Sequence, residues 1–132
     1  MIKYLVPYAA TATLMVALDL VWLGVVAKPL YQQGIGHLMA EQPKMAVAAL
    51  FYAIFALGLL VFAVLPSGTW IQSAASGALF GFFAYATYDL TNLATLRNWP
   101  LTLALLDMAW GTLVSGVSAV AGKFALDRLA QN

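Results

Sequence analysis

Four long apolar stretches account for most of this sequence, and each is long enough to cross a lipid bilayer. They run over residues 4–27, 45–65, 70–96 and 101–126. A transmembrane helix needs about 20 consecutive, mainly apolar residues. Because 64% of the 132 residues are hydrophobic and only 8% are charged, the polar side chains are too few to cover a water-soluble globule. The sequence therefore predicts an all-α, polytopic membrane protein, a single transmembrane domain (1–132) of four helices in a compact bundle.

The first stretch is predicted to be a retained helix and not a cleaved signal peptide. A signal peptide has an apolar core of about 7 to 15 residues followed by a small-residue cleavage site. The stretch 4–27 is longer, lacks such a site and contains Asp19. The Lys and Arg residues divide evenly between the two expected sides of the membrane, so only the amine of Met1 favours termini in the cytoplasm.

The connection between the first two stretches, residues 28–44, alternates apolar and polar side chains. This pattern is typical of a short helix at a membrane surface. We interpret it as a short interfacial segment, which either folds as a lid over the mouth of the bundle or serves as a plain linker. The later connections are short, so the helices they join are predicted to be antiparallel neighbours.

Several classes of function are excluded by composition. A net charge of +1 with singly spread basic residues provides no basic face for nucleic acid. The absence of cysteine and the single histidine exclude thiolate, iron–sulfur and two-histidine metal sites within one chain. We predict no cofactor and no metal, although Asp19, Asp89, Asp107 and Asn92 together have the oxygen chemistry of a single cation site.

Three aspartates lie at a similar predicted depth within the apolar stretches. Asp19 is nine residues from Lys28, Asp89 eight from Arg97, and Asp107 eight from Trp99. At about 1.5 Å per residue, each is roughly 12 Å below one surface of a hydrocarbon core about 30 Å thick. Asp89 and Asp107 are also symmetric about the turn of a tight hairpin, so they are predicted to face each other.

Small or polar residues recur on one face of three predicted helices, and we expect these faces to point inward. They are Tyr8, Thr11, Met15, Asp19 and Trp22 on the first, Ser73, Gly77, Gly81, Tyr85, Tyr88, Asp89 and Asn92 on the third, and Asp107, Gly111, Ser115, Ser118 and Gly122 on the fourth. Small residues let helix backbones approach closely in a membrane. The second helix has no ionisable residue and is rich in phenylalanine, so we interpret it as a lipid-facing buttress.

A charged side chain at mid-membrane costs about 2.5 to 3.5 kcal/mol, so intramembrane carboxylates indicate function by default. Carboxylates gathered in a low dielectric disfavour each other's ionisation, and at least one is expected to hold a proton near neutral pH. The structural alternative is that each Asp serves as interhelical glue, hydrogen-bonded to a Trp or Tyr. The predicted ligand- or proton-binding residues are Asp19, Asp89, Asp107, Asn92, Tyr85, Tyr88, Trp22 and Trp110. Trp70 and Trp99, near the ends of stretches, are predicted to be interfacial anchors.

Three hypotheses for function remain open. In the first, the acidic cavity binds or transports a small cationic or amphipathic molecule with proton exchange. A homo-oligomer is then expected, with Gly77 and Gly81 as a candidate interface, because four helices enclose little volume. In the second, the protein is a membrane enzyme acting on a lipid or isoprenoid, with an Asp as general acid. In the third, it is an accessory subunit without its own chemistry. The expected partners are membrane lipid and a small-molecule ligand.

Three motifs carry a resemblance to a known family. They are Leu-Asp-Leu-Val-Trp-Leu-Gly at 18–24, Tyr-Asp-Leu-Thr-Asn-Leu-Ala-Thr-Leu at 88–96 and Asp-Met-Ala-Trp-Gly at 107–111. In this pattern the chain resembles a bacterial family of predicted membrane proteins, domain of unknown function 2177, over nearly its whole length. The resemblance implies a bacterial inner-membrane location and a stand-alone unit of four helices, and it implies no particular activity.

Overall fold

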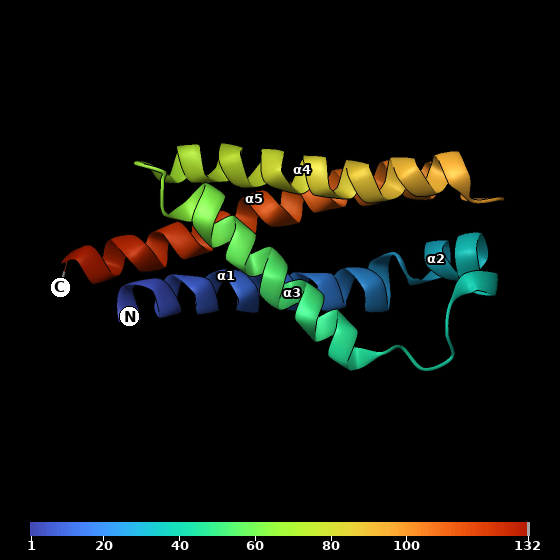
Figure 1. The fold of residues 1–132 in the computed structure, drawn as a ribbon, viewed down its shortest axis with the longest axis horizontal. Coiled ribbons are helices and arrows are strands. Elements are labelled where there is room, and N and C mark those ends of the chain that lie inside the picture. Colours follow the sequence, from blue (N-terminus) through green and yellow to red (C-terminus); the bar gives the residue numbers. More distant parts are fainter. Residues whose placement is uncertain (132) are drawn as a thin grey trace.

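The computed structural model describes residues 1–131, which form a bundle of helices (Figure 1). In chain order the elements are α1 (Ile2–Val21) continued by the π-helical segment η1 (Trp22–Val26), α2 (Lys28–Ile35), the 3₁₀ turn η2 (Gly36–Leu38), α3 (Met45–Leu59) continued by the π-helical segment η3 (Leu60–Val64), α4 (Trp70–Thr95) and α5 (Leu101–Gln131). The last helix runs past residue 126, where the sequence predicted its end.

Three helices of the described chain are long and apolar enough to cross a membrane. They cover Ile2–Val26, Met45–Val64 and Leu101–Gln131. α4 has sufficient length, with 26 residues, but it is not among these three, because its many Gly, Ser, Thr and Tyr residues lower its hydropathy. The prediction of an all-helical membrane protein is confirmed, whereas the count of four spans is not confirmed.

The helices run alternately up and down, apart from the short α2. α1 and α4 run in one direction and α3 and α5 return, so the N-terminus and the end of α5 lie at the same end of the bundle (Figure 1). α3 crosses the others obliquely: its last part, η3, lies against α4 and α5, while its start diverges from α4 (Figure 1). The main hydrophobic core gathers where these helices meet, around Met15, Leu59, Val64 and Val114.

α4 and α5 form the most extensive helix–helix contact, and glycines make it close. A Cβ atom at Gly77 would meet the Ala119 side chain and the Ser115 carbonyl oxygen, and one at Gly81 would overlap the Ser115 side chain. The predicted inward-facing stripes of small residues on α4 and α5 are confirmed, since these glycines and serines are buried. Gly77 and Gly81 are therefore covered by α5 of the same chain, and the expectation that they form an interface between copies is wrong.

The segment after α1 folds against the start of α5. Ile35 of α2 packs in a second buried cluster with Trp99, Leu103 and Ala104. Trp99 is only 8% exposed, so its prediction as an interfacial anchor is wrong, whereas Trp70 is exposed. α2 thus lies over one end of the bundle, at the end opposite the N-terminus (Figure 1).

The close contact between α4 and α5 predicts that Gly81→Ala destabilises the bundle, because overpacking a tight interface costs about 1 to 3 kcal/mol. Gly24→Ala is the control, since an added Cβ there meets nothing within 4 Å. Thermal unfolding of both variants in detergent should show a lowered midpoint for Gly81→Ala alone. Equal midpoints would contradict the packing described here.

Candidate functional site

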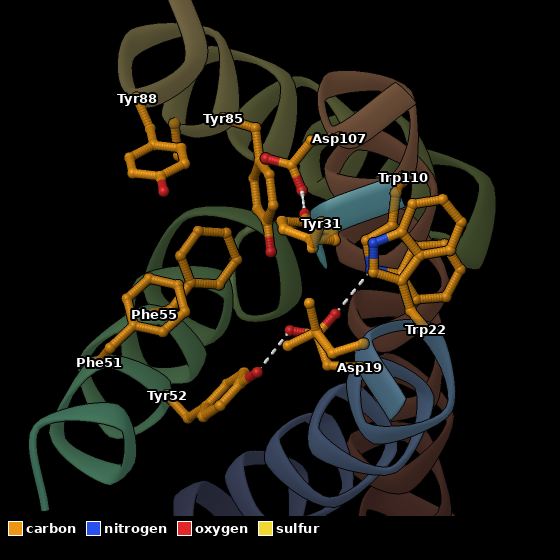
Figure 2. A pocket seen from close by; sticks show the side chains of 12 residues that line it. Asp19, Trp22, Tyr31, Phe51, Tyr52, Phe55, Tyr85, Tyr88, Asp107 and Trp110 are labelled. Carbon is orange, nitrogen blue, oxygen red and sulfur yellow. Dashed lines mark hydrogen bonds between the residues drawn. The ribbon is translucent and has the colours of Figure 1, made fainter. Parts of the chain in front are cut away.

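A cavity of about 400 Å³ lies among all five helices, and most of its wall is aromatic (Figure 2). Its lining residues are Asp19, Trp22 and Leu23 from the first helix, Tyr31 from α2, Phe51, Tyr52 and Phe55 from α3, Ala84, Tyr85 and Tyr88 from α4, and Asp107 and Trp110 from α5. Asp19 and Asp107 are the two carboxyl groups of this wall. Within residues 1–131 no Lys, Arg or His lines it, so any neutralising charge must come from a proton or a ligand.

Asp19 is held by two aromatic donors from different helices. The Tyr52 hydroxyl donates to Oδ2 at 2.6 Å and the Trp110 indole N–H donates to Oδ1 at 2.6 Å (Figure 2). Trp22, one turn after Asp19, stacks on Trp110 with ring centroids 4.7 Å apart and an interplanar angle of 4°. Residues three apart share a helix face, so α1 presents the carboxylate and the stacking indole to the same partner. Trp22 is the first residue of η1, and π-helical turns occur frequently at functional sites.

Asp107 is tied to the short helix α2. The Tyr31 hydroxyl donates to its Oδ1 at 2.7 Å across 76 positions of sequence (Figure 2). Burial raises the pKa of the Tyr31 hydroxyl above its usual range, and the neighbouring Asp107 carboxylate raises it further, so Tyr31 remains a donor at physiological pH. The hydrogen bond fastens α2 to the cavity.

Asp89 is not among the residues that line the cavity. Its side chain is fully buried, and within the described chain neither carboxyl oxygen has a hydrogen-bond partner of good geometry. The Asp107 carboxyl is nevertheless close enough for the two groups to interact directly. Asp19 in turn interacts electrostatically with Asp107. Asp107 therefore interacts with both of the other aspartates, which are not shown to interact with each other.

The structure places most of the residues proposed from the sequence around one space. Trp22, Tyr85, Tyr88 and Trp110 line the cavity together with Asp19 and Asp107. Asp89 adjoins the site, and Asn92 is half-buried outside the lining. Among residues 1–131, no three His, Cys, Asp or Glu side chains are grouped to hold a metal ion.

Sequence reasoning missed the contributions of α2 and α3. Phe51, Tyr52 and Phe55 point into the cavity, so the interpretation of the second long helix as only a lipid-facing buttress is wrong. The oblique crossing of α3 explains this, because it turns the first half of the helix toward Asp19. One signal was present: Tyr52 is the only hydroxyl-bearing residue of α3, in a helix that is otherwise wholly apolar.

The tie between Tyr52 and Asp19 can be measured by a double-mutant cycle. Tyr52→Phe should lower the free energy of unfolding by about 0.6 to 2 kcal/mol, the range for interhelical hydrogen bonds in membranes. In an Asp19→Ala background it should cost nothing further, because the acceptor is gone. The control is Tyr8→Phe, which removes a hydrogen bond to the Ala53 carbonyl and should be additive with Asp19→Ala. Reversible unfolding in mixed micelles gives the free energy of unfolding of each variant. If the effects of Tyr52→Phe and Asp19→Ala were additive, the hydrogen bond between the two residues would be contradicted.

Comparison with known proteins gives a family but no described relative. No curated protein and no solved structure matches the chain. A family model described as "Predicted membrane protein (DUF2177)" matches residues 4–124, which include Asp19, Asp89 and Asp107 and every residue that lines the cavity. The chain thus belongs to the domain of unknown function 2177 family of predicted membrane proteins.

Proposed function

We propose that this protein binds, and exchanges for protons, a small organic cation that carries apolar groups. The observation that supports the proposal is the wall of the cavity, in which two carboxyl groups are set among eight aromatic side chains. A cation over an aromatic face within about 6 Å gains about 0.5 to 2 kcal/mol or more when desolvated. Carboxylates supply the opposite charge, and the rings supply an apolar surface for the rest of the molecule.

The edges of the cavity favour a ligand that arrives from the lipid. Phe51 and Tyr88, on facing sides of the cavity, are 45% and 54% exposed, and α3 diverges from α4 in this region (Figure 1). In a bilayer, such exposed faces contact acyl chains. An amphipathic cation could therefore enter sideways with its charged group leading toward Asp19 and Asp107.

We further propose that α4 crosses the membrane beside α5, in the inner membrane of a bacterium, with both termini in the cytoplasm. α4 is 26 residues long, about 39 Å at 1.5 Å per residue, and it packs along α5, itself a candidate span. The polar residues that lower its hydropathy include Ser73 and Asp89, which are buried inside the bundle. Such a helix meets lipid mainly with its apolar face.

The cation proposal predicts that benzyltrimethylammonium binds the protein in lipid nanodiscs more tightly than its uncharged carbon analogue, neopentylbenzene. Asp19→Asn should weaken cation binding at least about 30-fold, since breaking a buried charge pair costs about 2 kcal/mol or more. Phe51→Leu should weaken it about 2- to 30-fold, the equivalent of the cation–π energy, with little effect on the neutral analogue. Equilibrium dialysis measures each affinity.

Asp127→Asn is the matched control for these variants. Asp127 pairs with Lys123 at 2.8 Å on α5 and does not line the cavity. The Asp127→Asn variant should bind the cation with the affinity of the parent protein. Equal binding of the cation and its neutral analogue, or equal weakening by Asp127→Asn and Asp19→Asn, would refute the proposal.

The arrangement with four crossings is testable because the chain has no cysteine of its own. Single cysteines at Lys3→Cys and Gln131→Cys should both react with a membrane-impermeant maleimide only in inverted vesicles. Lys44→Cys, one span away from Lys3, should react only in intact spheroplasts and serves as the internal reference. Labelling of positions 3 and 131 from opposite sides would show that α4 does not cross.

A further inference from the structure

The three neighbouring aspartates differ in the number of hydrogen bonds that they accept. Asp19 accepts one on each oxygen, from Tyr52 and Trp110. Asp107 accepts one, from Tyr31, and Asp89 accepts none although it is fully buried. A carboxylate that receives strong donors is stabilised as an anion, whereas a buried carboxylate without donors is costly. The three groups are thus suited to different charge states.

Asp89 and Asp107 meet between α4 and α5 as two groups that can both act only as acceptors when ionised. Two neighbouring carboxylates repel each other in a low dielectric. A single proton shared between them converts the repulsion into a hydrogen bond. The close packing of α4 on α5 at Gly77 and Gly81 opposes a separation of the two helices that would relieve the repulsion.

The other ionisable groups around the pair leave this arrangement unchanged. They are Asp19 from α1, Tyr31 from α2 and Tyr85 and Tyr88 from α4, and Tyr52 from α3 adjoins Asp19. The tyrosines are uncharged, and Asp19 is a further negative charge. None of these groups offers a positive charge to the pair, so only a proton or a ligand cation can neutralise it.

We propose that the aspartates divide the work of the site: Asp19 is the fixed counter-charge of the bound cation, and Asp89 with Asp107 holds one exchangeable proton. This assignment rests on the proposed binding of an organic cation. Asp107 belongs to both functions, because it lines the cavity and also adjoins Asp89. When a cation binds beside Asp107, the O–H bond of the pair breaks and the proton passes to water. One positive charge replaces another, and the net charge of the site stays the same.

The proposal separates the effects of two isosteric variants. Calorimetric titration of benzyltrimethylammonium in two buffers with different ionisation enthalpies counts the protons released. The parent should release about one proton per cation, and its affinity should rise with pH up to tenfold per unit. Asp89→Asn should still bind the cation but release no proton, with affinity independent of pH. Asp19→Asn should lose binding at every pH, and Asp127→Asn should behave as the parent.

A second measurement on the parent protein does not depend on whether Asp89→Asn folds. Difference infrared spectroscopy should show that the C=O band of a protonated carboxyl group disappears when the cation is added. Failure of the parent to bind the cation would refute the proposed function itself. Binding without proton release would refute the proton exchange and leave cation binding in place. Proton release that persists in a folded Asp89→Asn would refute only the division of roles.

Discussion

A carboxylate inside a bundle solvated by lipid has no bulk water to donate hydrogen bonds, so it must obtain its donors from neighbouring helices. Asp19 does so from Tyr52 on α3 and Trp110 on α5. The requirement of this one side chain fixes the spacing of three helices around it. The oblique course of α3 meets this requirement, because it brings Tyr52 to Asp19 while the end of the helix packs on α4 and α5 (Figure 1).

The glycines of α4 and α5 connect packing to the site. Gly77 and Gly81 bring the two backbones together, and the same proximity places Asp89 against Asp107. Gly111 has a further effect, because the Tyr85 ring occupies the space that a Cβ at this position would need. The Tyr85 side chain can therefore lie flat against α5 and form part of the cavity wall. A larger residue at 111 would push the ring into the cavity.

The parts of the structure that were predictable from the sequence are those that depend on spacing within one helix. Steps of three and four residues identified the buried faces, from Thr11, Met15 and Asp19 on α1 to Asp107, Gly111 and Ser115 on α5. The crossing angle of α3 leaves no such trace, so the position of Tyr52 could not be derived. Nor could the burial of Trp99, because it depends on α2 folding back over α5. The number of membrane spans was the most difficult feature to predict, because the small and polar residues of α4 that face the interior also lower its hydropathy.

The cost of the carboxyl groups is the strongest physical reason to assign them a function. The main core around Met15, Leu59 and Val114 and the contacts of Gly77 and Gly81 with α5 involve no carboxyl group. Replacing buried ionic groups by apolar residues of similar size is often neutral or stabilising in proteins. A bundle selected only for stability would therefore gain little from Asp89, which is buried and accepts no hydrogen bond. Such a group is useful where its charge state must change, and the one neighbour through which that change can reach the cavity is Asp107.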